Sequence, residues 1–145
     1  MKYSFGVLKP DCIKLNLVDR AIELVCSRGL RIIFSKKVML KPIDVEFLYS
    51  RCRQLSFFEN LLKFMTSGEI MVYITESTDS NCAIRTLNSV TGHTNPVEAK
   101  PDTLRSMGKN VCENIAHSTA DEQTFWSEVR YFLTKEEIKT LRLES

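Results

Sequence analysis

The chain has 145 residues, of which 43% are hydrophobic, so it can form one domain with its own core but is too short for two ordinary domains. Its 20 lysines and arginines nearly balance its 18 aspartates and glutamates, and no charged block indicates binding to nucleic acid or a membrane surface. Five cysteines, an odd number without a CxxC pair, support neither a disulfide framework nor a zinc site. No apolar run approaches the roughly 18 residues that a membrane span needs. We therefore expect one soluble, cytoplasmic domain over residues 1–145, with reduced thiols.

Strand and helix signals alternate through the first half of the chain. Apolar spacing, β-branched runs and breakers predict a strand over 3–8, a helix over 16–29, a strand over 30–40, a helical pair over 44–68 and a strand over 70–75. Pro10 ends the first strand and favours an extended conformation for Lys9. Asn16 is a candidate cap for the first helix, and Gly29 and Gly68 stop the helical segments before the next strands.

The second half continues in the same way around one long loop. The predicted elements are a helix over 79–92, a loop over 93–110, a short strand over 111–116 and helices over 118–133 and 134–141. Thr119 with Glu122, and Thr134 with Glu137, have the spacing of a capping box. Long loops inside compact domains are often functional, so the loop before the last strand is a candidate functional segment.

Four strands interleaved with helices in the order βαββαβ predict an α+β fold. We expect a ferredoxin-like, four-stranded, mostly antiparallel sheet covered by helices on one face.

His117 is the candidate for chemistry that the residues themselves single out. The common phosphate-loop, dinucleotide, zincin and hydrolase motifs are absent from the sequence. A lone histidine is usually a packed or surface side chain, but His117 follows a predicted strand and precedes a helix, where backbone N–H groups and the helix dipole favour an anion. Lys9, Tyr49, Phe57, Thr94 and Arg105 each have an ordinary explanation as solvated charge, turn residue or core aromatic, and gain weight only together.

Four segments in chain order resemble the motifs of nucleoside diphosphate kinases. They are VLKPD at 7–11, SFFENLLKFMTSG at 56–68, GHTNPVEAKPDTLR at 92–105 and NIAH at 114–117. The resemblance covers nearly the whole chain and implies a ferredoxin-like core. It also implies a ping-pong reaction, in which a histidine takes the γ-phosphate of a nucleoside triphosphate such as ATP and passes it to a nucleoside diphosphate.

The resemblance assigns roles to individual residues. Its catalytic residues are His117, Lys9, Tyr49 and Glu128. Its nucleotide-binding residues are Lys9, Phe57, Thr94, Arg105, Val111 and Asn114. Lys9, Arg105, Thr94 and Tyr49 would contact phosphate groups, and Asn114 the sugar hydroxyl. Phe57 and Val111 would hold the base by its faces, which every base offers, and Glu128 would orient the imidazole.

Two departures from the family pattern bear on nucleotide binding and turnover. Asn88 stands where the family places a phosphate-binding arginine, and Arg85, three residues earlier on a similar helical face, is a candidate substitute, so both join the expected binding residues. Losing a hydrogen bond to a charged group costs roughly 1.5–3 kcal/mol, so phosphate binding would weaken by about ten- to a hundredfold. After the histidine, Ser118-Thr119-Ala120 replaces the usual Gly-Ser-Asp.

The leading interpretation is an active nucleoside diphosphate kinase, and the alternative is a catalytically weak nucleotide-binding or assembly module of the same fold. The resemblance implies Mg²⁺ held mainly by the nucleotide phosphates, with no protein metal site, and a homo-oligomer, either hexamer or tetramer. A third interpretation, single-stranded nucleic acid binding, would need exposed strand aromatics among basic residues, and the sequence offers no clear basic surround.

Overall fold

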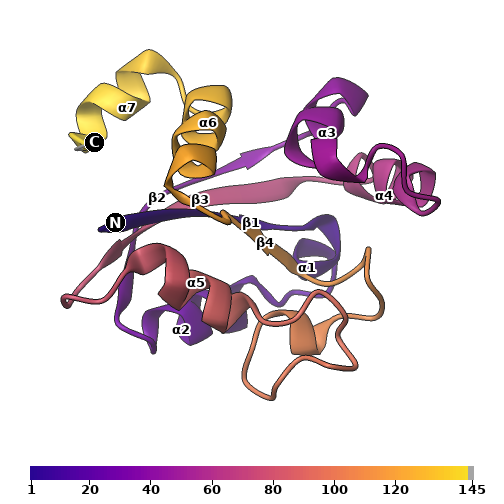
Figure 1. Cartoon of the computed structure of the whole chain (residues 1–145), viewed down its shortest axis with the longest axis horizontal. Helices are drawn as coiled ribbons and strands as arrows, with labels where there is room; N and C mark the ends of the chain where they lie inside the picture. The colour runs from indigo at the N-terminus through magenta and orange to yellow at the C-terminus, as the bar shows by residue number, and fades with distance from the viewer. Residues whose placement is uncertain (144–145) are drawn as a thin grey trace.

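The computed structural model describes residues 1–143 and contains a four-stranded antiparallel sheet between two layers of helices (Figure 1). The strands are β1 (Tyr3–Leu8), β2 (Leu30–Val38), β3 (Ile70–Ser77) and β4 (Ala116–Ser118). Their order across the sheet is β2-β3-β1-β4, so β1 pairs with β3 on one side and with the short edge strand β4 on the other. The predicted α+β fold with a four-stranded antiparallel sheet is confirmed.

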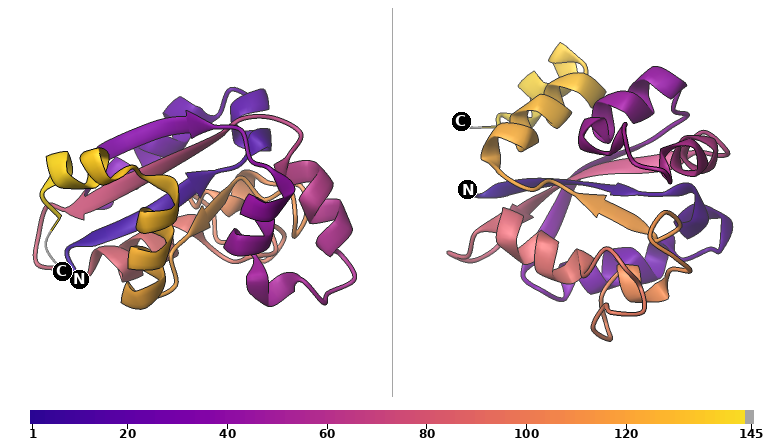
Figure 2. Two further views of the ribbon diagram at one scale, coloured as in Figure 1. Left: turned by 90° about the horizontal axis from the view of Figure 1, so that it is seen from above. Right: turned by 45° about the vertical axis from the view of Figure 1, so that its right-hand side comes forward.

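Helices cover both faces of this sheet, so the expectation of helices on one face was wrong. One layer holds α2 (Val18–Cys26) and α5 (Ala83–Thr91), and the other holds α3 (Pro42–Leu48), α4 (Phe58–Met65), α6 (Glu122–Phe132) and α7 (Lys135–Leu141) (Figures 1 and 2). The reason lies in β1, all of whose residues are buried. Phe5 and Val7 belong to the core under α6, whereas Leu8 belongs to the core under α2. A continuous apolar run of this kind is typical of a strand buried on both faces.

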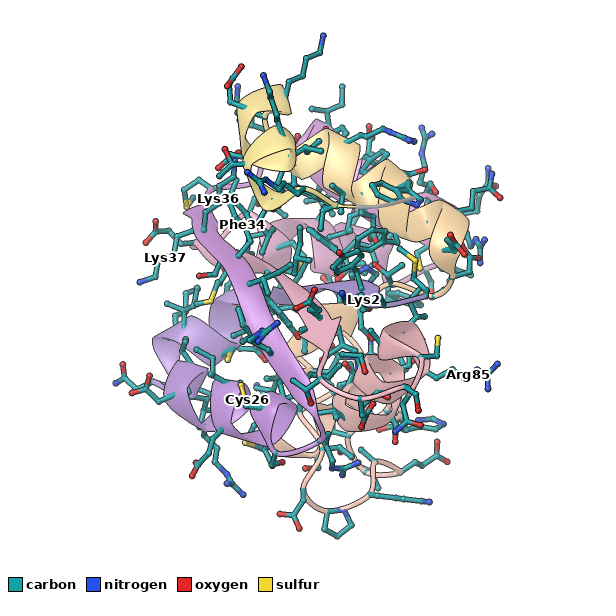
Figure 3. The ribbon with its side chains drawn as sticks, turned by 90° about the vertical axis from the view of Figure 1, so that its left-hand side faces the viewer. Lys2, Cys26, Phe34, Lys36, Lys37 and Arg85 are labelled. Carbon is teal, nitrogen blue, oxygen red and sulfur yellow. The ribbon has the colours of Figure 1, made fainter. Side chains whose placement is uncertain are left out.

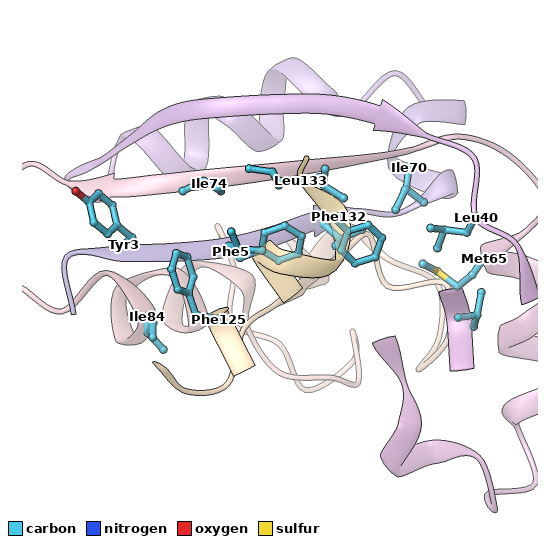
Figure 4. Packing of buried hydrophobic residues seen from close by; sticks show 14 of the residues in the cluster. Tyr3, Phe5, Leu40, Met65, Ile70, Ile74, Ile84, Phe125, Phe132 and Leu133 are labelled. Carbon is cyan, nitrogen blue, oxygen red and sulfur yellow. The ribbon is translucent and has the colours of Figure 1, made fainter. Parts of the chain in front are cut away.

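Aromatic side chains fill the larger of the two cores (Figure 4). Phe5 stacks on Phe132 with ring centroids 5.7 Å apart, and Phe125 is fully buried beside it. On the opposite face, the Tyr73 ring lies directly against Gly6, where any Cβ would overlap it. Tyr73 and Phe5 are both buried, which removes them from consideration as a base-stacking platform.

Three local predictions need correction. Residues 111–115 are loop rather than strand, and β4 begins only at Ala116, so His117 lies within the last strand instead of after it. Thr119 does not cap the following helix, because Asp121 is the N-cap and its side chain accepts from the Thr124 N–H at 2.8 Å. The short helix α1 (Pro10–Lys14), directly after β1, was not predicted.

Two other local predictions are confirmed. Lys9 is extended (φ −78°, ψ 169°), as expected for the residue before a proline. Thr134 and Glu137 form the reciprocal capping box at the start of α7.

Candidate active site

His117 is held by a carboxylate that belongs to another layer of the fold. Its Nε2 lies 2.7 Å from Oε2 of Glu128, which α6 presents toward the sheet, and the other carboxylate oxygen accepts from the Thr119 hydroxyl at 2.6 Å. A carboxylate only accepts hydrogen bonds, so Nε2 carries the ring proton and donates it to Glu128. Nδ1 then keeps its lone pair. The imidazole is therefore fixed in the tautomer in which Nδ1 is the nucleophilic nitrogen.

Lys9 contributes a buried amine to the same site. Its side chain is only 2% exposed, and Nζ donates to Oδ1 of Asn114 at 2.6 Å and to the Cys112 carbonyl at 3.3 Å. Burial, together with the nearby Arg105 guanidinium, lowers the pKa of Lys9 from 10.5 to about 7, while Asp11 acts in the opposite direction. The amine is thus poised to gain a proton when an anion arrives.

Arg105 supplies the second cation. It begins a short 3-10 helix, Arg105–Met107, within the segment predicted as a long loop, and its guanidinium donates to the Ala116 carbonyl at 3.0 Å and to the Gly92 carbonyl at 3.1 Å. Desolvation lowers its pKa as well. Within residues 1–143 neither Arg105 nor Lys9 forms an ion pair with a carboxylate. Two such cations brought together favour a polyanionic ligand.

The Tyr49 ring contacts both His117 and Lys9. Its ring lies 5.7 Å from the imidazole in an edge-on arrangement and 5.3 Å from Nζ of Lys9. Burial raises the pKa of the Tyr49 hydroxyl well above its usual range, so the group stays protonated and can donate. The hydroxyl is buried without a hydrogen-bond partner among residues 1–143. A buried donor without a partner is costly, so a ligand oxygen would satisfy it.

Asn114 connects Lys9 with two loop segments. Its amide nitrogen donates to the Thr94 carbonyl at 2.8 Å and to the Val111 carbonyl at 3.1 Å, and its oxygen accepts from Lys9. Both N–H groups are used, which leaves one lone pair of the amide oxygen for an incoming hydroxyl.

A γ-turn follows Asn114. The Ala116 N–H donates to the Asn114 carbonyl at 2.9 Å across Ile115, whose φ is +77°. Such a conformation costs a β-branched residue of the order of 1–3 kcal/mol. Two contacts hold it in place: the Ile115 N–H donates to the Asp11 carboxylate, and its carbonyl accepts from the Lys9 N–H. The strained turn thereby fixes Asn114 and β4 against the end of β1.

A cavity of about 510 Å³ opens beside the histidine. Tyr49, Arg51, His117, Asp121 and Glu128 are among its lining residues, which come from the segment after α3, from β4 and from α6. The imidazole is therefore reachable from outside, although its side chain is only 16% exposed. This volume is within the range of small-molecule sites.

The structure brings most, but not all, of the predicted residues together. Lys9, Tyr49, Arg105, Asn114, His117 and Glu128 form the connected group described above. Thr94 and Val111 reach it through backbone carbonyls that Asn114 contacts. Phe57 is the N-cap residue of α4 and packs on the larger core. Asn88 accepts a hydrogen bond from Ser118.

Arg85 is placed differently from the other predicted residues. It is exposed on the first turn of α5 and projects away from the ribbon (Figure 3). Within residues 1–143 it forms no hydrogen bond or ion pair with another predicted site residue.

The structure adds two residues that the sequence did not single out for this site. Thr119 was expected to cap a helix, but it is fully buried and donates to Glu128, and Asp11 holds the strained turn at Ile115. The one sequence signal for Thr119 was its position two residues after His117. In an extended chain, residues two apart lie on the same face, so the two side chains could share a role.

Comparisons with known proteins identify the family of this chain. A family model described as nucleoside diphosphate kinase matches residues 2–138. The chain belongs to the nucleoside diphosphate kinase family. The nucleoside diphosphate kinase of Rickettsia prowazekii is 32% identical over 139 residues, covering 95% of this chain and 97% of the relative. That of Campylobacter curvus is also 32% identical over 139 residues, covering 95% and 99%.

Solved nucleoside diphosphate kinases share the fold. The apo crystal structure from Encephalitozoon cuniculi superposes with a TM-score of 0.87 at 27% identity, covering all of this chain and 95% of that one. A halophilic nucleoside diphosphate kinase from Halobacterium salinarum, solved in complex with CDP, gives a TM-score of 0.85 at 24% identity and covers 94% of this chain and 90% of that one. The family and its named relatives identify the chain as a phosphotransferase.

No helix within residues 1–143 is long and apolar enough to cross a membrane. In the same part of the chain, no group of three or more His, Cys, Asp or Glu side chains is arranged to hold a metal ion.

Proposed function

We propose that the chain moves the γ-phosphoryl group of a nucleoside triphosphate to a nucleoside diphosphate through a phosphohistidine at His117. In the first half, Nδ1 attacks the γ-phosphorus, so that an N–P bond forms while the bond to the β-phosphate oxygen breaks and the diphosphate leaves. In the second half, a terminal oxygen of another diphosphate attacks the phosphohistidine and the N–P bond breaks. The hydrogen bond between Nε2 and Glu128 carries this proposal, because it leaves Nδ1 as the free nucleophile.

The groups around the imidazole have complementary tasks in this reaction. Glu128 stabilises the positive charge that the ring acquires as the N–P bond forms, and Thr119 holds the carboxylate in place. Lys9 and Arg105 neutralise the transferred and neighbouring phosphate oxygens. Tyr49 donates its otherwise unpaired hydroxyl to the same group. None of these steps requires Lys9 or Tyr49 to transfer a proton to substrate.

The nucleotide would enter between the α3–α4 region and the loop that contains Val111. Asn114 accepts from a sugar hydroxyl with the free lone pair of its amide oxygen. Phe57 and Val111, which is 42% exposed, contact the faces of the base, so nucleotides with different bases bind similarly. Mg²⁺ would arrive as part of the substrate, held by nucleotide phosphates and water. Assembly as a hexamer or tetramer and a cytoplasmic location remain part of the proposal.

Labelling with γ-phosphate-labelled ATP and Mg²⁺ tests the proposal. The expected result is an acid-labile, base-stable label on the protein that chases onto added GDP. His117→Ala must lose the label. His93→Ala is the matched control, because His93 is the only other histidine, lies on the surface beside Glu98 and is not part of the site. A wild-type protein that binds nucleotide but takes no label would contradict the proposal and favour a binding module of the same fold.

A further inference from the structure

β4, which carries His117, is an edge strand of three residues. Among the described strands it pairs with β1 alone, through the registers Gly6 with Ser118 and Val7 with His117. Backbone contacts continue this pairing at both ends, at Ile115 and at Thr119. So short a strand at the edge of a sheet depends on further contacts to fix its position. The position of the imidazole follows from the position of this strand.

Two side-chain contacts tie β4 to α5. Arg105 bridges the Ala116 carbonyl of β4 and the Gly92 carbonyl at the end of α5. The Ser118 hydroxyl donates to Oδ1 of Asn88 at 2.6 Å, on the last full turn of α5. Ser118 follows His117 directly, so its side chain points to the α5 layer while the imidazole faces Glu128. The second contact therefore acts on the residue adjacent to the nucleophile.

Both partners of this hydrogen bond are departures from the family pattern. Ser118 stands where that pattern has a glycine, and Asn88 stands where it has an arginine. Glycine has no side chain that could donate to Asn88, and a guanidinium offers only donors, so an arginine could not accept the hydrogen bond that Ser118 donates. Together, Ser118 and Asn88 form a side-chain contact between β4 and α5.

We propose that Ser118 and Asn88 form a positioning pair that fixes β4, and with it Nδ1 of His117, for phosphoryl transfer. The inference rests on the proposed function and concerns the same site. The pair acts through the strand and does not need to touch the nucleotide. Displacement of a reacting atom by about an ångström can slow a reaction by up to roughly a hundredfold, whereas substrate binding through other groups is unaffected. The pair should therefore affect kcat and leave KM nearly unchanged.

A double-mutant cycle on the intact protein tests the pair. Ser118→Ala and Asn88→Ala are each expected to lower kcat, and the rate of phosphoenzyme formation in a single turnover, by about two- to tenfold, the range of one neutral hydrogen bond. The double variant should be no slower than the slower single variant. KM for ATP should change by less than about twofold. Ser118→Thr, which keeps the hydroxyl, should restore the rate, and Ser89→Ala, an exposed neighbour on α5, should match wild type.

Each other outcome is decisive. Asn88→Ala raising KM while Ser118→Ala has no effect would make Asn88 a nucleotide ligand and overturn the pair. Fully additive losses in the double variant would also overturn it. If the variants unfold, measured by circular dichroism, the Ser118→Thr protein and the single-turnover rate at lower temperature decide between the same outcomes. A wild-type protein that takes no phosphate at all contradicts the proposed function itself, whereas labelled wild type with unaffected variants contradicts only the pair.

Discussion

Lys9 should take up a proton when nucleotide binds. In the free protein the amine is buried, contacts only neutral oxygens and lies near Arg105, and its pKa is lowered to about 7. A drop of this size corresponds to about 5 kcal/mol of preference for the neutral amine relative to a lysine in water. Phosphate oxygens placed beside Nζ reverse the balance, because an opposite charge at contact distance favours the protonated form. Binding and protonation are therefore linked.

The size and sign of the effect follow from the pKa. At pH 8 only about one Lys9 in ten is protonated before binding, so formation of the complex should take up about 0.9 proton, and at pH 7 about half a proton. Affinity should be greatest below pH 7 and fall by up to about tenfold per pH unit above it. Isothermal titration calorimetry of Mg²⁺–ADP at pH 8, in buffers of different ionisation enthalpy, measures the uptake. The nucleotide contributes no proton there, since its phosphates ionise near pH 6.

A matched variant separates the contribution of Lys9 from that of the His117 imidazole. His117→Ala removes the imidazole and keeps Lys9, so the uptake at pH 8 should persist in that protein. Lys9→Met should lose the uptake and bind ADP more weakly at every pH. Uptake below about 0.2 proton at pH 8 in both wild type and His117→Ala would refute the reasoning, because it would mean that Lys9 is already charged in the free site.

Three further outcomes are expected. Glu128→Gln should slow phosphoenzyme formation, followed by rapid quench, by about ten- to a hundredfold, because the charge-assisted bond to the imidazole is lost; an unchanged rate would argue against the orienting role. Gly6→Ala should destabilise the protein by about 1–3 kcal/mol in urea, since the new methyl meets the Tyr73 ring. Gly68→Ala should cost far less, because the nearest atom to its methyl is the flexible end of Lys14 and Pro10 lies at ordinary contact distance. Phe57→Ala should raise KM for ATP and GTP by similar factors, and a loss confined to one base would contradict stacking without base selection.

The sheet and its main helices were predictable because their signals are local. The apolar run of β1, the helical spacing of α5 and the capping box of α7 all depend on neighbours along the chain, and each element is present. The second helical layer was predictable in principle, because the apolar run of β1 is typical of a strand buried on both faces. β4 was misplaced since its three residues form a strand only by pairing with β1, more than a hundred residues earlier.

The site was predictable in its membership but not in its contacts. The motifs around Lys9, Arg105 and His117 identified residues that the fold then brings together. The Ser118–Asn88 hydrogen bond could not be foreseen, because it joins two positions 30 residues apart that each looked like an isolated departure. Arg85 was predicted as a substitute phosphate ligand from helical spacing alone. Its exposed position on the first turn of α5 shows that spacing along a helix does not specify which neighbours a face meets.

The position of the phosphoryl group on the imidazole tests the account most directly. The contact between Nε2 and Glu128 leaves Nδ1 as the nucleophile, so phosphorus NMR of the protein loaded with ATP and Mg²⁺, digested in alkali and compared with standards, should show phosphate on Nδ1 of His117. Phosphate on Nε2, or on a residue other than His117, would contradict the proposed geometry of the transfer.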